Sequence, residues 1–427
     1  MGFWNWIFGI DNSNSTSPST STGSAQNNNG RANMKNNTQA SRKRSTRTAP
    51  ATAKGCWFNG IGKGNPKPQD TLTVYAKNGK PLTLHSSDIQ ACGGEGTVYT
   101  VPIPGKAHAL IKIYKEDFQK NSSKTAELNA RIEAMTKIQD FYNTEQMGAF
   151  FAWPRMTVWD KQKKMIGFAM HRCTGSSFLP LLGGPASVKK AFPGWDRRNL
   201  LLTAIDFVKK VEFLAAHGVL INDFNPANFL VDKDSNVSFI DCDSYQIPDK
   251  TNGTHITHTF FPSHVAPELL RDKQSLMHPR NIHHVEFGTA LVVFQLLMCG
   301  LHPYNYYDPS HQSACGTPDE NLLKGRCPLG IGAGCRLPQG GWYKLWSYMT
   351  GSLKGAFIAT FRDGHSDPEK RTSLEDLRKE LEKFLYTMDK DPIRRNLTPA
   401  TAKPRGDKPG SGSAVFGKKS ENDWSFQ

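Results

Sequence analysis

Apolar positions along the chain follow two different spacings, and the change from one to the other divides it into two expected parts. The segments TLTVY and PLTL flank Asn78-Gly79 and predict a hairpin with a tight turn. HALIKIY (108–114) predicts a buried strand, and TVWDKQKKMIGFAM (157–170) predicts a second hairpin. These strands predict a small, mainly β lobe over residues 70–170.

Helical spacing dominates the second part. An apolar stripe first appears within residues 124–139, where it consists of Leu128, Ile132, Met135 and Ile138. Residues 196–217 predict a long helix, GTALVVFQLLMCG (288–300) predicts a helix buried on all sides, and residues 374–386 predict a last amphipathic helix. We therefore expect an α+β, bilobal protein whose larger, mainly helical lobe covers residues 171–389.

The two ends of the chain differ from the middle in composition and charge. Residues 1–69 begin with an aromatic decapeptide and continue as a basic segment rich in Ser, Thr and Asn, which predicts disorder, and residues 390–427 predict a flexible tail. The formal net charge is +15, but nine bases and no acid lie between Asn12 and Gln69, and the tail is basic as well. The middle is nearly neutral, which argues against specific nucleic-acid binding.

Cellular location follows from what the sequence lacks and from its first ten residues. No apolar run is long enough to span a bilayer, and the eight cysteines form no CxxC pair, so we expect reduced cysteines in a cytoplasmic protein. The decapeptide and the basic residues Arg42, Lys43 and Arg44 have two interpretations. They hold the protein peripherally at the anionic inner membrane surface, or the decapeptide docks into a groove of this chain or a partner.

The strongest chemical pattern is HGVLINDFNPANFLVDKDSNVSFIDCDSY (217–245). Asp223 precedes Asn228 by five residues, and two short apolar strands with a polar turn between them lead to Asp241. Phosphoryl transfer requires a carboxylate that accepts the proton of the attacking hydroxyl. It also requires an amide and a second carboxylate that hold Mg²⁺ on the phosphates of ATP. We assign the first role to Asp223 and the second to Asn228 and Asp241.

A glycine-rich turn lies upstream between two predicted strands. Gly93, Gly94 and Gly96 lack side chains, so their backbone N–H groups can approach phosphates. Lys112 follows on the next strand, where its ammonium group can reach the α and β phosphates of ATP. A carboxylate on the following helix would position that lysine.

With these motifs the chain resembles the protein kinase superfamily, in its bacterial eukaryotic-like branch, over residues 85–386. The resemblance implies that Asp223 is the catalytic base and that Lys112, Asn228 and Asp241 complete the active site. It further implies an ATP pocket and a protein-substrate platform, with these residues: Ala91, Gly93 and Gly96 in the nucleotide loop, Val98 and Leu110 above the adenine, Leu230 below it, Met170 at the hinge, and Ala266, Pro267 and Glu268 paired with Arg371.

The partner of Lys112 and several departures from the family pattern leave questions open. Glu127 is the favoured partner and Glu133 the alternative. Asn222 replaces the arginine that would clamp a phosphorylated activation loop, so control by loop phosphorylation is not expected. The aspartate expected near Val285 is absent, which predicts a less firmly anchored catalytic loop.

Three functions fit these patterns. The first is a Ser/Thr protein kinase with ATP and Mg²⁺, which phosphorylates an unknown protein and itself, and whose acceptance of tyrosine is left open. The second is a pseudokinase that acts as a binding module, since residues around Asp223 are altered. The third is a small-molecule phosphotransferase, against which the Ala266-Pro267-Glu268 platform argues. We favour the first because the lysine, the base, the amide and the metal carboxylate are all present.

Overall fold

The structure is a computed structural model, and it describes most of residues 70–399. The positions inside this range that it does not describe are 94, 102–108, 116–118, 120–121, 143–146, 250–252, 258, 306, 309–312, 315, 331–336 and 338–340. The predictions for the aromatic decapeptide, the basic segment up to residue 69, Gly94 and the tail beyond residue 399 therefore lie outside the described residues.

The chain divides into two compact units. Unit 1 comprises Met1–Asn121 and Thr157–Phe168, and unit 2 comprises Ser122–Met156 and Ala169–Gln427. The small lobe that the sequence predicts over residues 70–170 is thus shared between the units, because residues 122–156 group with unit 2.

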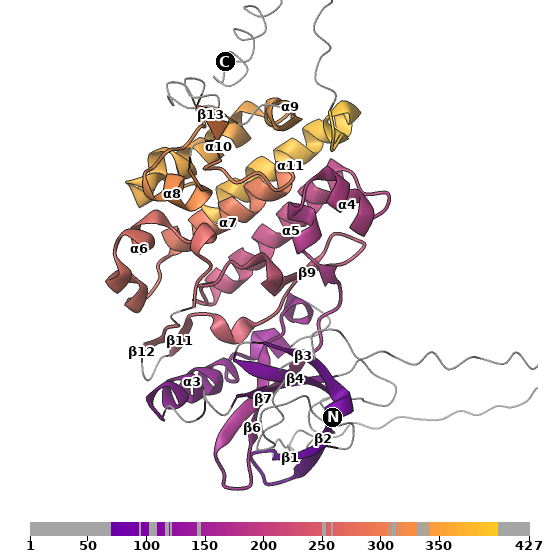
Figure 1. Cartoon of the computed structure of the whole chain (residues 1–427), viewed down its shortest axis with the longest axis vertical. Helices are drawn as coiled ribbons and strands as arrows, with labels where there is room; N and C mark the ends of the chain where they lie inside the picture. Colours follow the sequence, from indigo (N-terminus) through magenta and orange to yellow (C-terminus); the bar gives the residue numbers. More distant parts are fainter. Residues whose placement is uncertain are drawn as a thin grey trace, which may run out of the picture. The chain divides into compact units, whose positions relative to one another are not determined.

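A seven-stranded sheet with the order β2-β1-β6-β7-β5-β4-β3 forms most of the described part of unit 1 (Figure 1). Its strands are β1 (Thr71–Tyr75), β2 (Pro81–His85), β3 (Ile89–Cys92), β4 (Gly96–Val101), β5 (Ala109–Tyr114), β6 (Pro154–Trp159) and β7 (Met165–His171). The predicted first hairpin is present, since β1 pairs antiparallel with β2. Gly79 closes its turn with a φ of +86°, a left-handed conformation that glycine adopts without steric cost.

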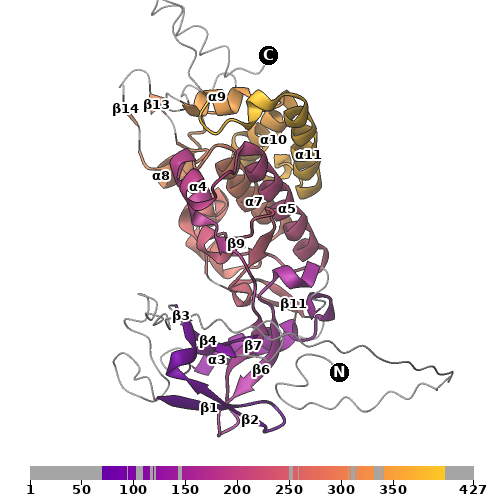
Figure 2. The same ribbon diagram turned by 90° about the vertical axis from the view of Figure 1, so that its right-hand side faces the viewer.

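Helices predominate in the described part of unit 2, and four of them pack around one another. They are α5 (Arg197–Ala216), α7 (Ile282–Leu297), α10 (Gly351–Phe361) and α11 (Leu374–Lys390), which lie alongside one another in both ribbon views (Figures 1 and 2). α7 is buried on nearly every side, as its uniformly apolar sequence predicts. Its Phe294 contacts Phe357 of α10 edge to face, with ring centroids 5.1 Å apart.

Other elements complete the described part of unit 2. The helices are α3 (Ser122–Met135), α4 (Pro185–Ala191), α6 (Pro267–Arg271), α8 (Pro318–Leu323) and α9 (Gly341–Ser347). The strands are β8 (Ser176–Ser177), β9 (Phe229–Val231), β10 (Val237–Phe239), β11 (Ile247–Asp249), β12 (Gly253–His255), β13 (Tyr307–Asp308) and β14 (Ser313–Ala314). One mainly β unit and one mainly helical unit confirm the predicted α+β class.

The structure bears on two expectations, one about membrane-spanning segments and one about the oxidation state of the cysteines. Among the described helices, none is both long and apolar enough to cross a membrane. Cys173, Cys242, Cys299 and Cys327 are free, as expected, whereas Cys92 at the end of β3 is disulfide-bonded. The expectation of reduced cysteines is therefore wrong at Cys92.

Candidate catalytic site

The loop after α5 folds back on itself and brings Asn228 to Asp223. Asn225 caps the short 3-10 helix Pro226–Asn228, because its side chain accepts a hydrogen bond of 3.0 Å from the backbone N–H of Ala227. The Asn228 amide nitrogen Nδ2 then donates to Oδ2 of Asp223 at 3.3 Å. The five-residue spacing seen in the sequence is thus a tight turn that places the two polar side chains together.

Asp241 approaches this loop from the end of a hairpin. β9 and β10 pair antiparallel, and the backbone N–H of Ile240 donates to the carbonyl oxygen of Asn228 at 2.9 Å. Asp241 follows directly and has a left-handed backbone, with φ 60° and ψ 35°. This conformation is uncommon outside glycine and is typical of residues held at functional sites.

The Asp223 carboxyl group lies in a surrounding that favours its protonated form. Burial raises its pKa above the ordinary value, and the negative charge of Asp241 raises it further. Hydrogen bonds from the backbone of Asn225 and the side chain of Asn228 act in the opposite direction without reversing the shift. The other carboxyl oxygen, Oδ1, is buried and has no hydrogen-bond partner among the described residues. No donor of the described residues therefore occupies the lone pairs of this oxygen.

These oxygens fit a magnesium ion that is shared with a nucleotide. Mg²⁺ prefers oxygen ligands and binds through one or two carboxylates, keeping water and substrate phosphates in its remaining positions. Asp241 and the amide oxygen of Asn228 could supply such ligands, since the Asn228 side chain contacts Asp223 and the charge of Asp241 acts on the same carboxyl group. The described residues contain no cluster of three or more metal-binding side chains, which a fully protein-coordinated ion would need.

Unit 1 holds the predicted phosphate loop and Lys112. The backbone N–H of Gly93 donates to the carbonyl oxygen of Gly96 at 2.9 Å, which closes the turn between β3 and β4. A Cβ atom at Gly96 would lie 2.7 Å from the carbonyl oxygen of Ile113 and 3.4 Å from Cγ of Lys112. Glycine at 96 therefore permits the close approach of the loop to the strand that carries the lysine.

Strand register places three predicted nucleotide-binding residues on one face. Val98 is directly opposite Lys112 in the antiparallel pair of β4 and β5, and Leu110 lies two residues from Lys112. Side chains two apart on a strand, and directly opposite across a pair, share a face of the sheet. Lys112 is buried, and its ammonium group lies 3.9 Å from Oε2 of Glu95 in the loop.

The remaining predicted residues belong to unit 2. Met170 is buried near the end of β7, and Leu230 is half-buried in β9. Glu127 is exposed on α3 and Glu133 is half-buried on the same helix. Since Lys112 belongs to unit 1, its pairing with either glutamate stays a prediction.

The expected ion pair of the substrate platform is present. Both terminal nitrogens of Arg371 donate to the Glu268 carboxylate at 2.7 Å. Arg371 also donates to the backbone carbonyls of Gly364 and His283, so this buried guanidinium ties α6 to the first turn of α7 and to the segment before α11. Burial opposes the ionised form of Glu268, but the hydrogen bond and charge of Arg371 outweigh it and lower the pKa of this carboxyl.

The structure also brings residues to the site that sequence reasoning missed. Arg131 on α3 donates to the backbone of the segment after Asp241. The ring of Phe224, directly after Asp223, lies against Gly288 of α7. The sequence did contain one signal for Arg131. Its position lies on the apolar helix stripe of Leu128, Ile132 and Met135, and a charged residue on such a stripe becomes buried and needs partners.

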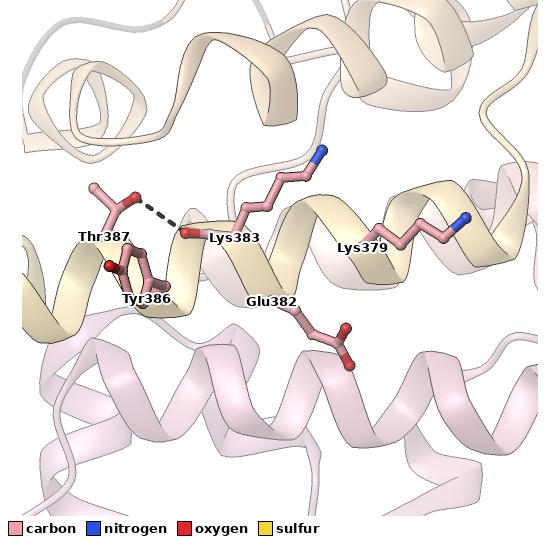
Figure 3. A pocket seen from close by; sticks show the side chains of 5 residues that line it. All are labelled: Lys379, Glu382, Lys383, Tyr386 and Thr387. Atoms are coloured by element: carbon pink, nitrogen blue, oxygen red, sulfur yellow. Dashed lines mark hydrogen bonds between the residues drawn. The ribbon is translucent and has the colours of Figure 1, made fainter.

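A shallow, open surface pocket lies elsewhere. It has a volume of about 520 Å³ and is lined by Lys379, Glu382, Lys383, Tyr386 and Thr387. All five side chains extend from α11, and Figure 3 shows Glu382 pointing toward the neighbouring helix. None of the candidate catalytic residues lines this pocket, so the site is identified by its chemistry and not by this cavity.

Comparison with known proteins agrees with this chemistry in general terms. The chain is 30% identical over 238 residues to Protein kinase YegI of Escherichia coli K12, which covers 55% of this chain and 34% of the relative. It is 30% identical over 237 residues to Protein kinase YegI of Escherichia coli O157:H7. The chain thus spans about a third of the length of the curated relatives it matches. No family model matches it. This similarity supports a kinase-like protein.

Proposed function

We propose that this chain is a protein kinase that transfers the γ-phosphoryl group of ATP to a Ser or Thr hydroxyl of a protein, with acceptance of tyrosine left open. The observation that carries the proposal is the meeting of Asp223, Asn228 and Asp241 in unit 2. The similarity to proteins named as protein kinases supports the same reaction class.

Asp223 acts on the attacking hydroxyl group. Its Oδ1 accepts the proton while Oδ2 stays hydrogen-bonded to the Asn228 amide, which fixes the direction of the carboxylate. Burial raises the pKa of Asp223, and a carboxylate with a higher pKa is a stronger general base. The raised pKa is therefore useful to the reaction rather than only a cost of burial.

The other residues hold the nucleotide. When bound, Mg²⁺ and ATP supply the phosphoryl group and the positive charge that stabilises it during transfer. Asn228 and Asp241 hold the metal, and Lys112 with Gly93, Gly94 and Gly96 holds the phosphates. The adenine contacts are proposed to come from these residues: Val98, Leu110, Met170 and Leu230. Glu127 is the proposed partner that positions Lys112.

Substrate and location are further parts of the proposal. The Ser/Thr-rich segment 12–50 contains many hydroxyl groups and is the expected site of autophosphorylation. We place the protein in the cytoplasm, and we propose that residues 3–10 together with Arg42, Lys43 and Arg44 make salt-sensitive contact with an anionic membrane surface.

The test uses ATP labelled in the γ position and the purified full chain. Wild-type protein should transfer label to itself or to a general acceptor protein, and Asp241→Ala should abolish transfer because one metal carboxylate is lost. Asp234→Ala is the matched control, since Asp234 is exposed in the turn of the same β9–β10 hairpin. Its activity should equal that of wild type.

Undiminished transfer by Asp241→Ala would show that the proposed site does not carry the reaction. Tight binding of ATP without any transfer by the wild-type chain would favour the binding module instead.

A further inference from the structure

Arg131 is a buried arginine on α3 that bonds to two segments far away in the sequence. Its Nε donates to the carbonyl oxygen of Asp243 at 3.0 Å, and its Nη1 donates to the carbonyl oxygen of Ile256 at 3.1 Å. The side chain is only 9% exposed. Both acceptors belong to the stretch between Asp241 and Ala266, so one side chain ties two separate points of this stretch to α3.

The same stretch is held from the side of the catalytic loop by Asn222. Its Nδ2 donates to Oγ1 of Thr257 at 2.9 Å, and that hydroxyl donates to the carbonyl oxygen of Ser244 at 2.7 Å. Asn222, Thr257 and Ser244 are all buried. Asn222 occupies the position at which the kinases that this chain resembles have an arginine for a phosphorylated loop. Here Asn222 instead contacts the hydroxyl group of Thr257.

Between these two anchors the backbone forms a hairpin. β11 pairs antiparallel with β12 from Ile247↔His255 to Asp249↔Gly253. The side chains of His255 and Asp249 are buried and lie 2.9 Å apart, which adds a polar contact across the pair. α3 packs against both strands. The described part of the segment is thus ordered by its own contacts.

Burial of a positively charged side chain such as that of Arg131 costs free energy unless hydrogen-bond partners or a function compensate for it. Arginine offers donors in a rigid plane, and two backbone carbonyls satisfy part of them here. The carbonyl of Asp243 is two residues from the proposed metal ligand Asp241. Movement of α3 would therefore be transmitted to the backbone beside the metal site.

We propose that Arg131 is a positioning residue that keeps the segment after Asp241 ordered without a phosphate group on it. Its consequence for catalysis rests on the proposed kinase function, whereas the ordering itself does not. α3 and this segment then form one structural latch, defined by Arg131, Asp243 and Ile256.

The test is amide hydrogen exchange on the full, phosphatase-treated chain without nucleotide, followed by transfer kinetics on the same samples. Residues 243–249 and 253–257 should be protected in wild type. Arg131→Met should raise exchange there by about tenfold or more, while α7 and α11 remain protected. It should also lower kcat by about ten- to a hundredfold with little change in the KM for ATP, because positioning is lost. Arg131→Lys, which keeps a donor, should lie between the two.

Lys137→Met is the matched control, since it removes a basic group from an exposed position just beyond α3. It should change neither exchange nor kcat. If Arg131→Met does not fold, Arg131→Lys still reports on the segment. Unchanged exchange at residues 243–249 and 253–257 in the folded variants would overturn the latch. A wild-type chain that shows this protection but transfers no phosphate would instead contradict the proposed function and leave the latch standing.

Discussion

At the scale of single residues, the catalytic loop is positioned by shape as well as by hydrogen bonds. The ring of Phe224 lies so close to Gly288 that a Cβ atom there would be 2.4 Å from Cδ2 of the ring. Phe224 is 4% exposed, and Gly288 lies in the fully buried part of α7. The sequence predicted a less firmly anchored loop because an aspartate near Val285 is missing. This ring contact provides an anchor that needs no carboxylate.

Gly288→Ala should therefore disturb the residue next to Asp223. Overpacking a buried site costs about 1–3 kcal/mol of the free energy of unfolding, and the shifted loop should lower kcat as well. Phe224→Leu alone should also destabilise by leaving a small cavity. In the double variant the smaller side chain makes room for the new methyl group, so the two costs should not add.

Urea unfolding and transfer rates of the two single variants and the double variant measure this coupling. A coupling energy of about 0.5–3 kcal/mol in the favourable direction is expected for residues in direct contact. Strictly additive losses would show that Phe224 and Gly288 do not position each other.

At the scale of elements, two buried histidines join the 3-10 helix Pro262–His264 to its neighbours. Nε2 of His264 lies 2.7 Å from Oε1 of Gln295 on α7, and Nε2 of His302 lies 2.9 Å from the carbonyl oxygen of Ser263. Burial lowers the pKa of His264 to about 3 and that of His302 to about 4. Both rings are therefore neutral in the folded protein at pH values where the unfolded chain binds protons.

This difference predicts a loss of stability in mild acid. Above the unfolded pKa of about 6.5, both histidines are neutral in the folded and the unfolded chain, so their burial carries no protonation cost. As the pH falls from there toward the folded pKa values, only the unfolded chain binds protons at these histidines, and the free energy of unfolding decreases. Each should add a slope of about 1.4 kcal/mol per pH unit between about pH 6 and pH 4.5. Urea unfolding at a series of pH values measures this slope.

Two variants separate these histidines from the rest of the chain. His264→Gln removes one buried ring and should reduce the slope, whereas His278→Gln changes an exposed histidine and should leave it unaltered. If the free energy of unfolding of the wild-type chain were the same at pH 7 and pH 5, these two histidines would not be neutral in the folded protein.

At the scale of the whole molecule, the sequence predicted what depends on local spacing. Periodicity located the long helices α5, α7 and α11 and the hairpin around Gly79, because amphipathic patterns and turn residues act within a few positions. The five-residue spacing of Asp223 and Asn228 and the strand before Asp241 located the core of the candidate site for the same reason.

Contacts between distant segments were not predictable in this way. Arg131 donates hydrogen bonds to Asp243 and Ile256, which lie more than 110 residues away in the sequence. Phe224 contacts Gly288 only because α7 packs against the catalytic loop. The buried position of Arg131 was visible in the helical stripe, but its partners depend on tertiary packing. The disulfide at Cys92 likewise has no local sequence pattern.

Asp223→Asn is the decisive variant for phosphoryl transfer at Asp223, Asn228 and Asp241. Asparagine keeps the size of the side chain and a hydrogen-bonding oxygen for Asn228, but it accepts no proton from a hydroxyl group. The variant should bind Mg²⁺ and ATP as tightly as wild type, and in single-turnover transfer of labelled phosphate it should be slower by on the order of 10² to 10⁴. A transfer rate equal to that of the wild-type chain would show that Asp223 is not the base of a phosphoryl transfer at this site.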